Sequence, residues 1–447
     1  MRDLMLLALL VGGCVWALRK PWVGVIMWTV ISLMSPHVTF GWASREWPVA
    51  TAVGLCTLIG WALTRERISP FQGPAAWSLL ALTLWMCITL PFSFDLDASL
   101  PLWERSMKIS LMLFVSMSLL DTRRKLDVFI WSIVVSVGYY GVKGGLFTFL
   151  TGGNYRTWGP GGFIGGNNEL ALALILVIPF MHYLQLQSSS AWVRRGLLAS
   201  MALCAVAALG THSRGAFVGV GGMLLYFWWK ADRKLLWGVS LLILGAAVLA
   251  SMPDHWWERM ESILTYKEDA SAMGRINAWV AAWNIARDRL FGGGFWVALP
   301  WVFEIYAPTG SRTAVAHSIY FQMMGEHGFV GLALFLLVGL FSWLNARALI
   351  RLAAPHDKRD WRRVLGQMVQ VSMIGYAITG AFLSMAYFDL PYNVMVISAL
   401  ALRFARLESR DASTQTAVDG RVAQGGVDLT SSARAGTRAS RGVQGAD

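Results

Sequence analysis

Apolar runs long enough to cross a bilayer recur along this chain from the N-terminus to about position 404. Hydrophobic residues make up 56% of the chain and charged residues only 14%, which excludes an ordinary soluble domain. A transmembrane β-barrel would need short segments of alternating polarity, whereas runs such as 235–250 are apolar on every face. The sequence therefore predicts an all-α polytopic membrane protein.

The candidate spans are separated by loops whose charge predicts their orientation. They lie at 4–18, 21–37, 48–64, 75–93, 104–120, 126–150, 168–185, 196–211, 213–229, 235–251, 318–346, 364–386 and 391–404. Successive basic clusters, such as Lys230–Lys234 and Arg347–Arg363, are separated by two spans, so all of the clusters can face the cytoplasm. The intervening loops then face the opposite side, and the largest of these is a periplasmic loop at 252–317.

The first apolar run leaves two topologies open. Residues 1–18 resemble a signal peptide, but Arg19, Lys20 and Pro21 follow in place of a small-residue cleavage site, so we expect the segment to be retained. If 4–18 crosses the membrane fully, there are thirteen spans and the N-terminus is outside. If it only dips into the bilayer, there are about twelve transmembrane helices and both ends are cytoplasmic, which is the arrangement that we favour.

Two further segments are predicted outside the spans of the 1–406 membrane domain. Residues 407–447 are rich in Gly, Ser, Thr, Ala and Arg without an apolar face, which predicts a disordered cytoplasmic tail. The loop 252–317 has an aromatic start, a predicted helix around Arg275 to Arg289 and a turn at Gly292–Gly294. Its tryptophans suit a helix at the lipid surface, so we expect this loop to cap the bundle.

Composition also excludes several classes of partner. The net charge of +12 arises from Lys and Arg in short loops and the tail, as membrane topology requires, so it does not indicate nucleic acid. The four cysteines lie in apolar runs without a CxxC pair. The loop carboxylates are irregularly spaced and lack the paired arrangement that a divalent ion needs. These carboxylates are Asp254, Glu258, Glu261, Glu268 and Asp269. We therefore expect no metal and no cofactor.

His317 lies where the longest polar loop joins what reads as an uninterrupted apolar helix. A titratable imidazole at a membrane surface can take part in chemistry on a lipid-borne substrate. A histidine in such a place is more often an interfacial polar residue, so position alone does not make it catalytic.

Two arginines are expected outside the cytoplasm, where the positive-inside rule gives no reason for them. Arg214 enters a span from a short external turn, and the small residues after it, such as Gly215 and Gly219, allow close helix packing. Arg275 is expected in the first turn of the loop helix, beside free N–H groups that suit phosphate oxygens. The alternatives are a headgroup anchor for Arg214 and a salt bridge from Arg275 to Glu268 or Asp269.

A third external arginine, Arg156, precedes the glycine-rich run at 159–171. The glycines either serve turn geometry, the reading that we favour, or form a cradle of backbone N–H groups for an anion. Dinucleotide binding is excluded, because the flanking elements are membrane helices and not strands.

Together, THSRGA at 211–216, the pattern from Gly274 into FGGG at 291–294, and AHSIYFQMMGEHGFVGL at 316–332 resemble the bacterial O-antigen ligase and polymerase superfamily. The order of the parts matches as well: an arginine at a span junction, two spans, a large loop with a second arginine, and a histidine leading into a helix. Residues 19–37 are similar to O-glycosylation ligases of exosortase-type systems.

The resemblance implies an inverting, metal-independent glycosyltransferase. It would move a glycan from undecaprenyl pyrophosphate to lipid A–core oligosaccharide, in the inner membrane of a Gram-negative bacterium with the active site facing the periplasm and membrane lipids around it. Arg214 and Arg275, with Arg156 added tentatively, would bind the donor pyrophosphate and stabilise the leaving group. His317 would deprotonate the attacking hydroxyl.

Several other functions remain open at this point. Within the family, the alternatives are a surface-polysaccharide polymerase and a protein O-glycosylation ligase. A flippase for lipid-linked saccharides would show inverted repeats and broken helices near mid-membrane, which the sequence does not indicate. A non-catalytic scaffold would tolerate loss of His317 and the arginines.

Overall fold

The computed structural model describes residues 2–71, 73–230, 233–250, 257 and 270–411. Within these ranges every regular element is helical, apart from an isolated bridge between Gly161 and Ile164. The helices are α1 (Arg2–Arg19), α2 (Pro21–Met34), α3 (Pro36–Phe40), α4 (Val49–Leu63), α5 (Pro74–Thr89), α6 (Leu96–Leu119), α7 (Arg123–Leu150), α8 (Asn167–Gln187), α9 (Ala191–Gly210), α10 (Arg214–Lys230), α11 (Lys234–Ala250), α13 (Ala270–Asp288), α14 (Pro300–Tyr306), α15 (Ile319–Arg351), α16 (Trp361–Gly380) and a last helix, Asp389–Asp411. Two 3₁₀ turns, η1 (Ala43–Glu46) and η2 (Leu90–Phe92), complete the elements.

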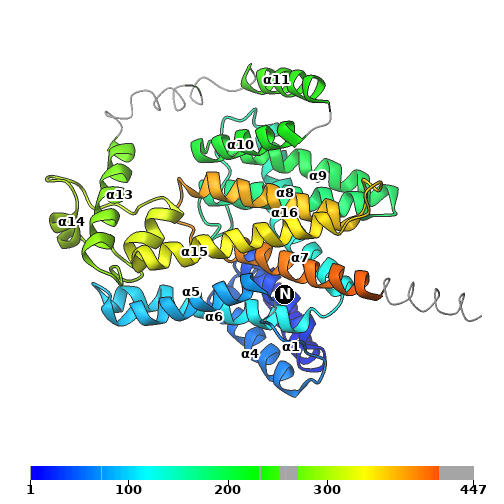
Figure 1. The fold of residues 1–447 in the computed structure, drawn as a ribbon, viewed down its shortest axis with the longest axis horizontal. Coiled ribbons are helices and arrows are strands. Elements are labelled where there is room, and N and C mark those ends of the chain that lie inside the picture. Colours follow the sequence, from blue (N-terminus) through cyan, green and yellow to red (C-terminus); the bar gives the residue numbers. More distant parts are fainter. Residues whose placement is uncertain (1, 72, 231–232, 251–256, 258–269, 412–447) are drawn as a thin grey trace, which may run out of the picture.

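The long helices lie side by side as a bundle (Figure 1). Six of the described helices are long and apolar enough to cross a membrane, namely α5 with η2, α7, α8, α9, α15 and the last helix. The most enclosed are α8 and the last helix, with 72% and 78% of their most apolar windows buried inside the protein. Each predicted span overlaps a helix, which confirms the all-α membrane fold; the number of crossings stays a prediction.

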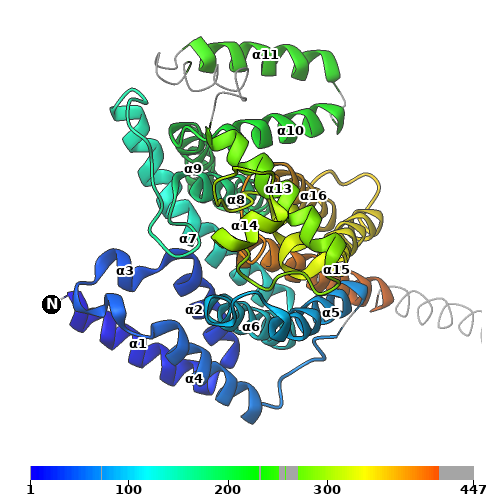
Figure 2. The same ribbon diagram turned by 90° about the vertical axis from the view of Figure 1, so that its left-hand side faces the viewer.

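The first helix extends along its neighbour α4 over the full length of both (Figure 2). At one end, the Asp3 carboxylate accepts hydrogen bonds from Trp42 N (2.9 Å), Ser44 N (3.2 Å) and Ser44 Oγ (2.8 Å). At the other end, a side chain at Gly60 would meet the carbonyl oxygen of Ala17 at 2.6 Å. This is the packing expected of the alternative in which residues 4–18 cross fully.

Helix α13 lies steeply inclined to α15 at one end of the bundle, with α14 beside it (Figure 1). We call this end the α13 end. The helix predicted in the large loop is therefore present, and it covers the bundle end as expected. Residues 251–256 and 258–269, which begin that loop, lie outside the described residues.

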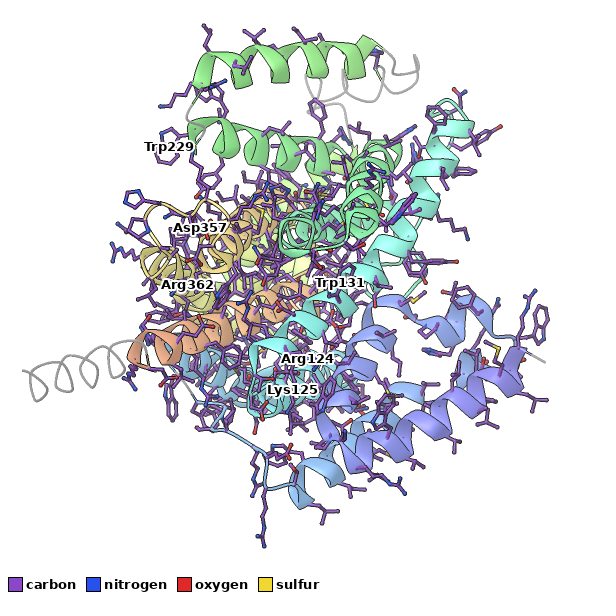
Figure 3. The ribbon with its side chains drawn as sticks, turned by 90° about the vertical axis from the view of Figure 1, so that its right-hand side faces the viewer. Arg124, Lys125, Trp131, Trp229, Asp357 and Arg362 are labelled. Carbon is purple, nitrogen blue, oxygen red and sulfur yellow. The ribbon has the colours of Figure 1, made fainter. Side chains whose placement is uncertain are left out.

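The opposite end of the bundle carries charged residues of several loops and helix starts. Figure 3 views it, with Arg124 and Lys125 at the start of α7 and Asp357 and Arg362 near the start of α16. Their grouping agrees with the predicted segregation of basic clusters to one side.

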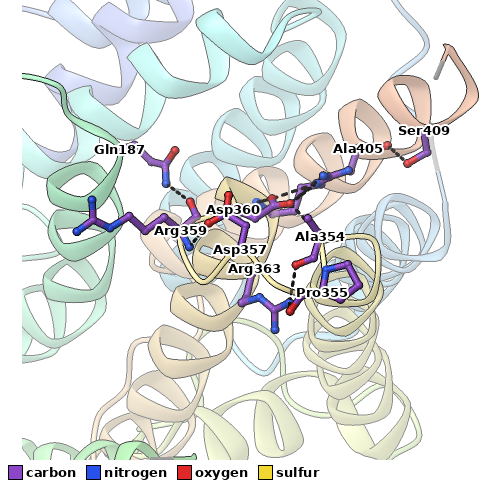
Figure 4. A network of polar contacts seen from close by, with 10 residues as sticks. Gln187, Ala354, Pro355, Asp357, Arg359, Asp360, Arg363, Ala405 and Ser409 are labelled. Atoms are coloured by element: carbon purple, nitrogen blue, oxygen red, sulfur yellow. Dashed lines mark hydrogen bonds and ion pairs between the residues drawn. The ribbon is translucent and has the colours of Figure 1, made fainter. Parts of the chain in front are cut away.

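A network of polar contacts orders the loop between α15 and α16 at that end (Figure 4). Asp360 caps the N-terminus of α16, and its carboxylate accepts hydrogen bonds from Arg362 N at 2.8 Å and from Ala354 N at 2.8 Å. Gln187, the last residue of α8, donates to the carbonyl oxygen of Arg359 at 3.0 Å. The loop is therefore tied both to its own helix and to the core helix α8.

Several predicted elements need correction. Helix α15 is interrupted at Gly328, whose backbone has φ 71° and ψ −175°. The span predicted at 364–386 is helical only to Gly380, and 381–388 is a loop buried at Leu383 and over 385–388. Residues 407–411, predicted as the start of the tail, continue the last helix, and 412–447 lie outside the described residues.

Candidate functional site at the α13 end

His317 has an unusual backbone conformation that two neighbouring segments hold in place. Its φ is 44°, in the left-handed region that residues other than glycine seldom adopt. The backbone N–H donates to Ser384 Oγ at 2.8 Å. One residue earlier, the carbonyl oxygen of Ala316 accepts from Trp279 Nε1 at 2.7 Å. A loop after α16 and a helix of the large loop thus fix His317 just before α15 begins.

Arg275 lies near His317, as required if the two are to act on one substrate. Burial lowers the pKa of the half-buried His317 imidazole below its ordinary value, and the positive charge of Arg275 lowers it further. The imidazole is therefore neutral at neutral pH and able to accept a proton.

The environment predicted for Arg275 needs correction. Helix α13 begins at Ala270, so Arg275 lies in its second turn and not its first. The free N–H groups of the helix start therefore lie one turn before Arg275 in the chain. The alternative partners Glu268 and Asp269 lie outside the described residues.

Aromatic stacking and small residues dock α13 on the start of α15. The ring of Trp279 stacks on Phe321 with centroids 4.9 Å apart and planes 5° apart. One turn further along both helices, a side chain at Gly325 would meet Ala282 Cβ at 3.0 Å. Since Trp279 also binds the segment before His317, the same contacts that dock the helix position the histidine.

The FGGG turn packs against the interruption of α15. Gly293 N donates to the carbonyl oxygen of Gly325, and Gly294 N to that of Glu326, both at 2.9 Å. A Cβ at Gly328 would lie 2.3 Å from the carbonyl oxygen of Leu290. The FGGG motif at 291–294 and residues 326–328 of the motif at 316–332 are therefore in direct contact. We call this contact region the joint.

A chain of buried polar side chains links this joint to the loop 381–388. Thr89 Oγ1 lies 2.7 Å from His327 Nδ1, and His327 Nε2 lies 2.7 Å from the hydroxyl of Tyr387. That hydroxyl donates to Glu326 Oε2. Gln322 Oε1 accepts from Ala386 N at 3.2 Å. Because buried polar groups keep their geometry only when they are satisfied, these bonds hold the segment that carries Ser384.

Helix α10, which Arg214 begins, packs against the same loop from another side of the bundle. Arg214 is the first residue of α10, as predicted, and half-buried. Close packing by the small residues is confirmed: a Cβ at Gly215 would meet Phe382 Cβ at 3.1 Å, and one at Gly219 would meet Thr379 Oγ1 at 1.9 Å. Arg214 therefore begins a helix that rests on the end of α16, next to the segment that binds His317.

Arg156 is exposed on a loop that packs against the turn before Arg214. Its neighbour Thr157 donates from its N–H to the carbonyl oxygen of Gly210 at 3.0 Å, and Asn167 Nδ2 donates to that of Thr211 at 2.8 Å. All three arginines are thus carried by segments at the α13 end, but Arg156 has the least protein around it.

The glycine-rich run after Arg156 packs over a fourth arginine. The guanidinium of Arg105 lies 3.5 Å from the ring centroid of Phe163. Gly161 and Gly162 have φ of 116° and 63°, and Ile164 N donates to the carbonyl oxygen of Gly161 at 3.1 Å. These contacts agree with the turn-geometry reading of the glycines.

Sequence reasoning missed several residues of this site. The sequence predicts Ser384 inside the span 364–386 and Tyr387 in the short external loop that follows it, and only the polarity of Ser384 near Gly380 signals a longer loop. Glu326 and His327 were read as part of a motif without a role. His212 lies within THSRGA; it is buried, with φ 52° and Nε2 at 2.9 Å from the carbonyl oxygen of Gly153.

The part of the chain that the structure describes contains no group of three or more His, Cys, Asp or Glu side chains arranged to hold a metal ion. The loop carboxylates considered above lie outside it. Metal independence therefore stays a prediction for experiment.

Comparison with known protein families shows which family the segment around His317 resembles. Residues 199–336 match the profile of a family described as O-antigen ligase. This part of the chain belongs to the O-antigen ligase superfamily. The O-antigen ligase segment contains Arg214, Arg275, His317 and the joint at Gly328.

The rest of the chain lies outside that match. Residues 1–189, which include Arg156, match a family of unknown function (DUF5935). Ser384 and Tyr387 lie outside both matches, so the O-antigen ligase segment is completed by residues beyond it. A search of curated proteins gives no match.

Proposed function

We propose that this protein is an inverting, metal-independent glycosyltransferase of the O-antigen ligase type. It moves a glycan from undecaprenyl pyrophosphate to lipid A–core oligosaccharide at the periplasmic face of the inner membrane. The observation that carries the proposal is the placement of a neutral imidazole, His317, beside Arg275 at the bundle end that α13 covers. The O-antigen ligase match over these residues supports the reaction class.

The proposed chemistry uses one base and two cations. His317 accepts the proton of the attacking hydroxyl, whose oxygen forms a bond to the anomeric carbon from the face opposite the pyrophosphate. The bond between that carbon and the pyrophosphate oxygen breaks, and undecaprenyl pyrophosphate leaves with the electron pair. Arg214 and Arg275 stabilise the leaving charge, which a metal ion does in many other glycosyltransferases. Arg156 is exposed, and it binds either the phosphate that carries the donor's glycan or the glycan itself.

We further infer that α1 crosses the membrane, which gives thirteen spans and a periplasmic N-terminus. The support is the contact of Asp3 with Trp42 and Ser44, in a loop expected outside the cytoplasm. An N-terminal epitope should then be accessible to antibody in spheroplasts with an intact inner membrane. Accessibility only after that membrane is permeabilised would restore the twelve-span topology.

The proposed reaction is tested by reconstitution. Purified protein in proteoliposomes should transfer glycan from undecaprenyl-pyrophosphate donor to lipid A–core, with and without EDTA, and the product should carry the inverted anomeric configuration. Elongated lipid-linked glycan as the main product would instead indicate a polymerase. Glycan on a protein acceptor would indicate an O-glycosylation ligase. Movement of the donor across the bilayer without any transfer would indicate a flippase.

A further inference from the structure

A cavity of about 150 Å³ lies between α13 and the first turns of α15. Its apolar wall includes Ala278, Ala281 and Trp296, and its polar wall includes Gln322, Glu326, Ser384 and Tyr387. Glu326 and Tyr387 are 6% and 5% exposed, so little of either side chain reaches open solvent. The cavity therefore has an apolar side and a hydrogen-bonding side.

Small side chains create the space. The alanines 278, 281 and 282 lie on one face of α13, at spacings of three and four residues, and all line the cavity. A water molecule needs roughly 10–15 Å³ of such space, so the cavity is about ten times larger than a single-water void. In a protein interior, which is otherwise close-packed, a void of this size beside a buried carboxyl calls for a polar occupant.

The cavity adjoins the reacting residues without containing them. Ala316, which lines it, directly precedes His317, and Ser384, which also lines it, accepts the His317 N–H. Arg275 lies one helical turn before Ala278 on the same face of α13. An occupant would therefore lie next to the chain segments that carry His317 and Arg275.

We propose that this cavity is a subsite for one sugar ring of the transferred or receiving glycan. A hexose ring carries hydroxyls around its edge and C–H groups on its faces, which fits the division of the walls. Gln322 and Glu326 bind the hydroxyls, and the ring of Trp296 packs against a C–H face. The proposal rests on the proposed function for the identity of the glycan. It applies equally to the donor's first sugar and to the acceptor's terminal sugar.

Two substitutions test the subsite from opposite directions. Ala281→Leu adds three carbons inside the cavity, and Trp296→Ala removes the apolar wall without crowding it. Val280→Leu is the matched control, because Val280 is on α13 and 38% exposed. The probes are two lipid-free oligosaccharides, the glycan released from the donor and the core oligosaccharide released from the acceptor. Isothermal titration to the purified full-length protein measures binding without turnover, and melting temperatures establish that each variant is folded.

We expect the wild type and Val280→Leu to bind one of the two oligosaccharides. Ala281→Leu and Trp296→Ala should weaken that binding at least about tenfold, the scale of losing one good contact. The oligosaccharide affected tells whether the ring belongs to the donor or to the acceptor. Absence of binding by the wild type, or unchanged binding in folded Ala281→Leu and Trp296→Ala, would overturn the subsite. Sugar binding that meets this expectation, in a preparation that transfers no glycan, would reject the glycosyltransferase and leave the subsite standing.

Discussion

The backbone N–H of His317 donates to the Ser384 hydroxyl at 2.8 Å, although the two residues are 67 positions apart in sequence. This bond joins the start of α15 to the loop after α16, and it acts on a residue whose φ is 44°. Left-handed backbone costs a non-glycine residue free energy, so it persists only where surrounding contacts impose it. Ser384 therefore orients the proposed base without touching the proton that the base accepts.

Replacing Ser384 with Ala should lower kcat several-fold while leaving KM for the donor nearly unchanged. One neutral hydrogen bond contributes about 1 kcal/mol, which corresponds to roughly a fivefold effect. Ser384→Thr retains the hydroxyl and should restore most of the rate. Steady-state transfer rates in proteoliposomes measure both. A Ser384→Ala enzyme with unchanged kcat, or a Thr variant as slow as the Ala variant, would separate Ser384 from the positioning of His317.

His317→Ala should bind donor almost normally and transfer glycan at least about a hundredfold more slowly, the usual scale for losing a general base. Donor binding is measured with a labelled lipid-linked glycan and turnover with the full assay. Equal losses in binding and turnover would make His317 a donor ligand, and wild-type turnover would make it structural.

The pH dependence of the wild-type rate should reflect the lowered pKa of His317. Only the neutral imidazole can accept a proton, and burial and Arg275 both favour that form. The rate should therefore hold through neutral pH and fall only as the pH drops below the ordinary imidazole pKa. In Arg275→Gln the positive charge is gone, so the acid limb of the remaining activity should move to higher pH. Arg275→Lys, which keeps the charge, should leave the limb in place; a limb at the same pH in all three enzymes would contradict the coupling.

Arg214→Ala and Arg275→Ala should each insert normally in the membrane and lose most transfer activity. Loss of transition-state stabilisation by a guanidinium corresponds to a hundredfold or more in rate, on the order of several kcal/mol. Arg312→Ala is a suitable control, because that arginine is exposed on the same loop as His317. Near-normal rates in both well-expressed variants would remove the two arginines from the mechanism.

Gly328→Ala should destabilise the protein by about 2 kcal/mol or more, because the new Cβ meets a backbone oxygen and φ is 71°. Gly339→Ala is the control on the same helix, since nothing lies within 4 Å of its Cβ position. Thermal unfolding in detergent, followed by the fluorescence of a thiol-reactive dye, compares the two. An equal melting temperature for Gly328→Ala and wild type would show that the joint relaxes at no cost.

The sequence predicted the bundle well, because apolar runs report directly on burial in lipid. Arg214 and His317 were also located correctly at helix starts, since charged residues at span boundaries are conspicuous. What could not be predicted depends on contacts between distant segments. The apolar pattern around Gly328 continues across the interruption, so the break shows only when Leu290 and the FGGG turn pack against it. The apolar run of α16 continues past Gly380 without a strong breaker, so the sequence predicts a loop only from residue 386, although the loop begins at 381 and includes Ser384.

Because Ser384 lies late in the chain, the contacts that hold His317 in place form in a fixed order during synthesis. A ribosome that has just inserted α15 has already produced the two arginines and His317, yet α16 and the segment after it are still missing. The hydrogen bond to the His317 backbone and the Tyr387 contact with Glu326 form only when the chain is nearly finished. A nascent or truncated chain that has reached the membrane therefore carries the proposed catalytic side chains without the contacts that hold His317 in place.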